Sequence, residues 1–247
     1  MTNAIDNLLC CYDFDGVFGK VSKPNFSFVE KCGYPGGTRG EKFRAERKAI
    51  EEKIGESALV SLMIDIFKRN NSKPTHEEIR QYVDALEYNP GVETYFDRIK
   101  CAAKNSNLKN YLISGGFVEY LRELPFAGHM DKIYGATFDG DFKNYDELKV
   151  HAIKDILTTN SRAEDDCRGM IYIGDGPSDR EALRYVGGHG GTAILVHAAG
   201  ETSEYYNDMI KDGIAISHYV EADFTDGSEL FGILSGAANQ TEHSRER

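Results

Sequence analysis

The stretch that most constrains the fold is LLCCYDFDGV at positions 8–17, an apolar run that ends in two acidic residues. A short apolar run of this kind, bounded by Gly16, is typical of a strand buried on both faces of a parallel sheet. Ligands of such sheets gather beyond the carboxyl ends of the strands, which is where Asp13 and Asp15 fall. The segment alone fits equally well a catalytic pair of carboxylates and an ordinary polar strand end.

The composition is that of an ordinary globular protein with an acidic charge balance. The chain has 29 Lys and Arg against 40 Asp and Glu, a net charge of −11. This balance disfavours nucleic acid and anionic membranes as general partners, although a local cation can still bind a phosphate-bearing substrate. The five cysteines show no metal-ligand spacing, and we find neither a signal peptide nor a run of membrane length. We therefore expect a cytoplasmic protein with reduced thiols.

The order of the segments predicts an α/β domain interrupted by a helical insertion. Between positions 20 and 88 three helical patterns follow one another, and the last begins at a capping box formed by Thr75 and Glu78. From about Asn89 onwards strand and helix patterns alternate, which predicts a parallel sheet with helices on both faces. We expect a Rossmann-like core at 1–19 and 89–247 and a helical cap at 20–88.

A second motif at a predicted strand end is Ser114 with Gly115 and Gly116, after the apolar segment NYLIS. A strand, a glycine turn and a helix start bring a hydroxyl and free backbone N–H groups together, which suits an anion. The same residues also form turns and helix caps that bind nothing, and on these residues alone that explanation is the more common one.

The third candidate is a lysine of the helical segment KVHAIKDIL, which contains both Lys149 and Lys154. The first turn of a helix that follows a parallel strand lies nearest the carboxyl edge of the sheet, and a residue five positions later starts roughly 7.5 Å further away. This geometry favours Lys149 over Lys154. Without the other motifs, either would be read as an ordinary solvated lysine.

The strongest motif is MIYIGDGPSD at positions 170–179, in which Asp175 and Asp179 bracket a tight Gly-Pro turn. Both carboxylates can approach one hard cation such as Mg²⁺, and Asp179 can cap the following helix at the same time. With Asp13 and a phosphomonoester dianion, the site would carry five negative charges. At an effective dielectric constant near 20, each like-charge contact at about 4 Å costs roughly 4 kcal/mol, so cations are required.

These four motifs together make the chain resemble the haloacid dehalogenase (HAD) superfamily of phosphohydrolases. DFDGV resembles the first motif of that family, LISGG the second, Lys149 the third and IGDGPSD the fourth, in the same order. The resemblance covers positions 8–19 and about 89–234. A cap between the first and second motifs, with SGGF and a following GATFDGD, is most similar to the phosphoserine phosphatase-like branch.

The resemblance implies a role for each matching residue. Asp13 would be the nucleophile, and Asp15 the general acid and base. Ser114 and Gly115 would bind the phosphoryl group, and Lys149 would bridge the nucleophile and the phosphate.

The cofactor implied by the resemblance is Mg²⁺, held by Asp13, by the backbone carbonyl of Asp15 and by Asp175, with Asp179 in support. The implied reaction is hydrolysis of a small phosphorylated metabolite through an aspartyl phosphate on Asp13. Two alternatives remain open. One is transfer of the phosphoryl group to a hydroxyl acceptor, and the other is a non-catalytic signalling domain whose phosphorylated Asp13 is read by a partner.

The expected cap also offers positive side chains that could contact an anionic substrate. A solvated charged helix face is the more common explanation for each of them. The four candidates are Arg39, Lys42, Arg44 and Arg47.

Overall fold

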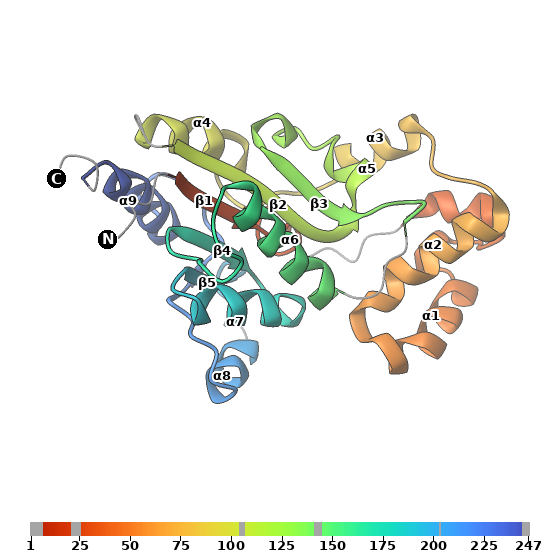
Figure 1. Cartoon of the computed structure of the whole chain (residues 1–247). Helices are drawn as coiled ribbons and strands as arrows, with labels where there is room; N and C mark the ends of the chain where they lie inside the picture. The colour runs from red at the N-terminus through yellow and green to blue at the C-terminus, as the bar shows by residue number, and fades with distance from the viewer. Residues whose placement is uncertain (1–6, 21–25, 104–106, 141–144, 203, 244–247) are drawn as a thin grey trace.

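Six strands form one parallel sheet in the order β3-β2-β1-β4-β5-β6 (Figure 1). The computed structural model describes residues 7–20, 26–103, 107–140, 145–202 and 204–243. The strands are β1 (Asn7–Tyr12), β2 (Asn107–Phe117), β3 (Lys132–Ala136), β4 (Met170–Gly174), β5 (Thr192–His197) and β6 (His218–Glu221). The parallel α/β architecture predicted from the alternating strand and helix patterns is confirmed.

Helices cover both faces of this sheet. On one face α4 (Val92–Ala102) packs against α9 (Glu229–His243), and on the other lie α6 (Tyr145–Thr159), α7 (Arg180–Gly188) and α8 (Glu204–Lys211). The central strand β1 alternates between the two cores: Leu8 belongs to the core with α4 and α9, and Leu9 to the core with α6 and α7. Because both faces of β1 are buried, its sequence is an unbroken apolar run.

The chain between β1 and β2 is helical. It contains α1 (Glu41–Ile54), α2 (Ala58–Asn70) and α3 (His76–Asp84), with the short 3-10 helices η1 (Ser27–Cys32), η2 (Gly37–Arg39) and η3 (Gly55–Ser57). In Figure 1, α1 and α2 lie on the side toward which β2 and β3 point. The predicted capping box is confirmed, since the Thr75 hydroxyl accepts the backbone N–H of Glu78 and the Glu78 carboxylate accepts that of Thr75. The division into a core and a cap at positions 20 and 88 stays a prediction.

The region around Ser114 differs from the expected strand, turn and helix. Strand β2 continues through Ser114 and the two glycines to Phe117, with a register shift against β3 between Ile113 and Phe117. The following helix α5 (Val118–Leu121) is a single turn. Glycines tolerate such an irregularity in a strand, so Ser114 lies in a distorted strand end and not directly before a helix.

The chain after β5 also adds elements that the sequence patterns did not predict. Strand β6 has four residues, of which only Val220 is buried, so it shows neither an apolar run nor a clear alternation. Helix α9 runs from Glu229 to His243. The GATFDGD segment begins in β3 with Gly135 and Ala136, and its last residue, Asp141, lies outside the described residues.

No helix in the described ranges is both long and apolar enough to cross a bilayer.

Candidate active site

The site lies where β1 and β4 run side by side. The chain leaves β1 toward β2 on one side, whereas it leaves β4 toward β5 on the other, so the connections diverge and open a crevice at the carboxyl ends of the strands. Asp13 follows β1 directly, and its backbone N–H donates to the Ile173 carbonyl of β4 at 2.9 Å. Asp175 follows β4 in the same way. The two strand-end acids of the sequence therefore meet at the topological switch point.

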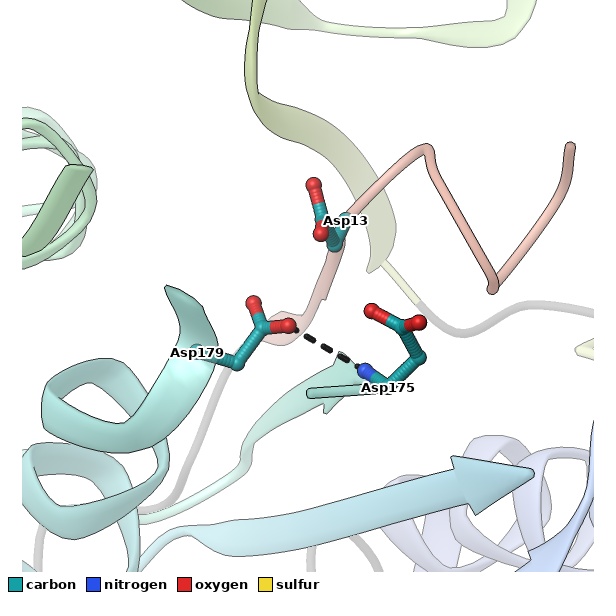
Figure 2. Close-up of side chains that lie close together, drawn as sticks. All are labelled: Asp13, Asp175 and Asp179. Carbon is teal, nitrogen blue, oxygen red and sulfur yellow. Dashed lines mark hydrogen bonds between the residues drawn. The ribbon is translucent and has the colours of Figure 1, made fainter. Parts of the chain in front are cut away.

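Three carboxylates converge in this crevice from three segments of chain (Figure 2). Asp13, Asp175 and Asp179 each offer an oxygen atom, and these oxygens all lie within 4.8 Å of one another. Asp13 and Asp179 are buried, and Asp175 is half-buried. An all-oxygen donor set of this size fits a hard divalent cation such as Mg²⁺. The side chain of Asp15 is not part of this cluster, and its predicted metal contact through the backbone carbonyl stays a prediction.

Lys149 is the cation that the fold brings to these carboxylates. Its side chain is 1% exposed, and its Nζ lies 3.0 Å from Oδ2 of Asp13 and 2.7 Å from Oδ1 of Asp179. Lys154, the other candidate of the same helix, is 41% exposed and lies 3.8 Å from a carboxylate oxygen of Glu164. Lys149 in the second turn of α6 points into the crevice, whereas Lys154 points to the surface.

Asp179 fixes several parts of the site at once. Its carboxylate accepts hydrogen bonds from Lys149, from the Tyr172 hydroxyl, and from the backbone N–H of Asp175 at 3.1 Å. The N–H of Gly176 also lies 3.4 Å from the same oxygen as that of Asp175. Both carboxylate oxygens are thus engaged by protein donors, so Asp179 positions Lys149 and the turn after β4. The sequence analysis missed Tyr172, whose only signal is a hydroxyl-bearing ring in an otherwise aliphatic strand.

The electrostatics of the cluster show an excess of negative charge. Burial raises the pKa of Asp13 well above its usual value; Lys149 opposes this shift, and the other three aspartates add to it. Burial, and then the charge of Asp179, raise the pKa of Asp175 to about 8. Burial lowers the pKa of Lys149, but the carboxylates of Asp13 and Asp179 outweigh it and raise that pKa above its usual value. One lysine does not balance these acids, which is the charge pattern expected of a cation site.

A cavity of about 1010 Å³ opens over the cluster, and Asp13, Asp15, Lys149 and Asp175 line it. The Asp15 side chain is exposed, but the surface it presents faces this cavity. Loss of surrounding solvent there raises the pKa of Asp15, Lys149 opposes the shift, and Asp179 adds to it. A carboxyl group with a raised pKa beside the cluster has the property required of a general acid.

Asn89 holds the turn that carries Asp15. Its side-chain N–H₂ group donates to the carbonyls of Gly16 at 3.1 Å and Val17 at 2.9 Å, and its backbone N–H donates to Phe18 at 2.8 Å. The sequence analysis used Asn89 only to mark where the strand and helix patterns begin to alternate. The structure shows that this residue ties the start of the strand and helix alternation to the loop after β1.

Ser114 and Gly115 occupy different positions relative to the cavity. Gly115 lines it, together with Gly116, and a β-carbon on Gly115 would come within 2.1 Å of the Tyr145 ring. Ser114 is fully buried, and its hydroxyl accepts the Gly116 N–H at 3.0 Å. The predicted contact of Ser114 with a phosphoryl group stays a prediction.

The four basic residues considered as possible substrate contacts do not lie on the wall of this cavity, and a contact of any of them with substrate stays a prediction. None of Arg39, Lys42, Arg44 and Arg47 lines it. Lys42 donates to the Gly33 carbonyl and lies over the Tyr34 ring, and Arg47 pairs with Glu51. The lining residues of the helical segment come from α2, from α3 with the chain just after it, and from Lys20 and Phe26 before η1, whereas no residue of α1 lines the cavity.

Gly16 leads to the first testable prediction. It has φ +72°, and a β-carbon there would lie 2.0 Å from Oδ2 of Asp175. We expect Gly16→Ala to displace Asp175, to weaken Mg²⁺ binding at least tenfold and to lower the free energy of unfolding by more than about 1 kcal/mol. Gly213→Ala is the matched control, since Gly213 has φ +70° with nothing within 4 Å. Equal Mg²⁺ affinity of the two variants in a calorimetric titration would contradict the close approach.

The comparisons with known proteins agree with this fold. No protein family model matches the chain, and no curated protein does. Among solved structures, a HAD family hydrolase from Salmonella enterica serovar Typhi superposes with a TM-score of 0.57 at 17% identity. That alignment covers 86% of this chain and 66% of the Salmonella protein.

Two other similar structures have nearly the length of this chain. CbbY from Rhodobacter sphaeroides, solved in complex with phosphate, has a TM-score of 0.52 at 11% identity, and the alignment covers 89% of this chain and 96% of CbbY. A predicted phosphoglycolate phosphatase from Haemophilus somnus has a TM-score of 0.51 at 11% identity, with 92% and 98% covered. The chain has the fold of the HAD-superfamily hydrolases.

Proposed function

We propose that this protein is a Mg²⁺-dependent phosphatase that hydrolyses a small phosphate ester through an aspartyl phosphate on Asp13. The observation that carries the proposal is the buried contact of Lys149 with Asp13 and Asp179 beside Asp175, at the switch point of a HAD fold. A buried lysine against clustered acids is unfavourable for a purely structural site, whereas phosphoryl transfer requires all of these charges.

The first half of the proposed reaction forms the phospho-enzyme. A carboxylate oxygen of Asp13 attacks phosphorus, the bond from phosphorus to the ester oxygen breaks, and Asp15 gives its proton to the leaving oxygen. Lys149, held by Asp179, orients Asp13 and offsets the charge of the phosphoryl oxygens. The backbone N–H groups near Gly115, on the wall of the cavity, are suited to bind the same oxygens.

The second half releases the phosphate. Asp15, now ionised, accepts a proton from water, the water oxygen attacks phosphorus, and the bond to Asp13 breaks, which yields inorganic phosphate and the original carboxylate. Asp13, Asp175 and the carbonyl of Asp15 would hold Mg²⁺, with Asp179 in support. When bound, the ion supplies positive charge to the phosphoryl oxygens.

The branch within the superfamily and the cellular setting are also proposals. The SGGF and GATFDGD motifs favour the phosphoserine phosphatase-like branch, whereas similar structures include a predicted phosphoglycolate phosphatase and a HAD subfamily IA hydrolase from Geobacter sulfurreducens. We propose the phosphate-ester class without committing to either of those substrates. A helical cap at 20–88 and a cytoplasmic location complete the proposal, the latter supported by five free cysteines.

Both alternatives use the same site. A signalling domain would keep a long-lived phosphate on Asp13, but a general acid and base at Asp15 and a cavity of about 1010 Å³ serve turnover of a substrate. A transferase would pass the phosphoryl group to a hydroxyl in place of water, and the four motifs are the same in both reactions. The hydrolase is therefore favoured over the signalling domain. An assay must decide whether water or a hydroxyl group accepts the phosphoryl group.

The direct test is release of phosphate from p-nitrophenyl phosphate. We expect activity with Mg²⁺ and its loss in excess EDTA, with recovery when Mg²⁺ is restored. Mg²⁺ at about 100 times its Kd should also stabilise the fold by about 2.7 kcal/mol, and Asp175→Asn should remove that gain. Asp212→Asn, a change at the exposed acid that pairs with Arg180, is the control. Full activity in EDTA after dialysis would contradict Mg²⁺ dependence.

A further inference from the structure

Beyond the carboxylates, two parts of the chain give the cavity an apolar wall, and a third part, from Val196 to Tyr205, adds polar side chains such as His197, Glu201 and Thr202. The core contributes Phe117 from β2, Tyr120 and Leu121 from α5, and Leu124 after it. The helical segment between β1 and β2 contributes Phe26, Leu59, Met63, Tyr82, Val83 and Leu86. A cavity with a polar end and an extended apolar wall is the usual form of a site for an amphiphilic small molecule.

Three of these residues keep part of their surface free. Leu59, Tyr82 and Leu86 are half-buried, whereas Met63 and Val83 beside them are buried. Tyr82 comes from α3 and Leu86 from the chain just after it, and both line the cavity. We call these three residues the apolar ledge. Apolar surface that faces a cavity instead of the core costs free energy until an apolar ligand covers it.

The aromatic ring of the apolar ledge is held in place before any ligand binds. Tyr82 stacks on Phe26 with 4.6 Å between ring centroids and meets Tyr120 edge-on at 4.9 Å. Tyr82 and the proposed general acid Asp15 line the same cavity. The organic group of a leaving group protonated by Asp15 would therefore extend into the space that Tyr82 lines, and a pre-formed ring surface binds it at little entropic cost.

The charges around the cavity disfavour a substrate with a second anionic group. Among the described lining residues there is no arginine, and the lysines are Lys20 and Lys149. Lys149 is occupied by Asp13 and Asp179, and Lys20 pairs with Glu87 at 3.2 Å. His197 and Glu201 also line the cavity. A carboxylate on the organic part of the substrate could pair only with His197, or with Lys20 in exchange for Glu87, and it would face Glu201 and the acids of the cluster.

We propose that the organic group of the substrate is uncharged and carries a ring or a comparable apolar body, which packs on the apolar ledge of Leu59, Tyr82 and Leu86. This inference rests on the proposed phosphatase function and specifies its substrate class. It excludes phosphoserine and phosphoglycolate as preferred substrates, because both carry a carboxylate next to the ester.

The test compares four phosphate compounds on the wild-type protein with Mg²⁺: benzyl phosphate, ethyl phosphate, phosphoglycolate and acetyl phosphate. We expect kcat/KM for benzyl phosphate to exceed that for ethyl phosphate and for phosphoglycolate at least tenfold. Tyr82→Ala should lower the value for benzyl phosphate about tenfold and that for ethyl phosphate less than threefold. Tyr82→Phe should keep the wild-type preference, because the ring and not the hydroxyl carries the contact.

Tyr185→Ala is the matched control, since Tyr185 is a half-buried tyrosine of α7 that does not line the cavity. It should leave the benzyl to ethyl ratio unchanged. If phosphoglycolate or ethyl phosphate equals benzyl phosphate on the wild-type protein, the inference is wrong, and this result does not depend on whether Tyr82→Ala folds. If none of the four compounds, including the small activated acetyl phosphate, releases phosphate, the proposed function itself fails.

Discussion

Asp13→Asn is expected to lower the kcat of Mg²⁺-dependent phosphate release by about three orders of magnitude or more. The amide is a poor nucleophile, so the two-step route through a phospho-enzyme is closed. Because an Asn at this position can deamidate back to Asp, Asp13→Ala serves as a second variant and should show the same loss. The measurement is steady-state release of p-nitrophenol, with the fold checked by circular dichroism.

The matched control for Asp13 is Asp226→Asn, which makes the same chemical change at an exposed carboxylate. Asp226 is 76% exposed and pairs with Arg98 at 2.7 Å, outside the cavity lining. We expect its kcat to stay within a factor of two of the wild-type value. A folded Asp13→Ala protein that retains more than a tenth of wild-type kcat would rule out Asp13 as the nucleophile.

Lys149→Met is expected to remove both activity and a large part of the stability. The side chain lies between Asp13 and Asp179 and is 1% exposed, so its replacement leaves buried carboxylates without their cation. Breaking a buried ion pair by removing one partner costs about 3–5 kcal/mol. Urea unfolding without Mg²⁺ measures this loss. Saturating Mg²⁺ should recover part of the stability, because the ion restores positive charge to the cluster, but not the activity.

Lys154→Met is the control on the same helix, one and a half turns further along. Its side chain is 41% exposed and its Nζ lies 3.8 Å from a carboxylate oxygen of Glu164, a surface contact worth no more than about 1 kcal/mol. We expect near wild-type activity and stability. If the two lysine variants unfold at the same urea concentration, Lys149 does not hold the site together as described.

The core of the fold was predictable because its signals are local. The apolar run of β1 is unbroken because Leu8 and Leu9 point into two different dry cores, and the strand and helix alternation after Asn89 leaves few other topologies. Strand β6 escaped prediction because it is short, lies at the edge and buries only Val220. Its place in the sheet depends on pairing with β5, which is a tertiary contact and leaves no pattern in the sequence.

Of the residues in the site, those that directly follow a predicted strand could be placed from the sequence. Asp13 and Asp175 each follow an apolar strand, and parallel topology brings such ends to one edge. Asn89 and Tyr172 were missed because their roles are hydrogen bonds to residues distant in the sequence or across a turn. Whether the basic residues in and before α1 reach the cavity could not be predicted for a similar reason. Whether a charged helix faces a cavity depends on how its neighbours pack, and α2 and α3 form the wall.

The measurement that tests the central claim most directly is mass spectrometry of the phospho-enzyme. Asp15→Asn should still be phosphorylated by an activated donor such as acetyl phosphate but should lose the phosphate slowly, because no base activates water. After a rapid acid quench with Mg²⁺ present, we predict the mass of one phosphoryl group on the peptide that contains Asp13, labile to hydroxylamine. If the protein is active but no phosphoryl group is found on that peptide, or if the phosphoryl group is found on any other residue, the account is contradicted.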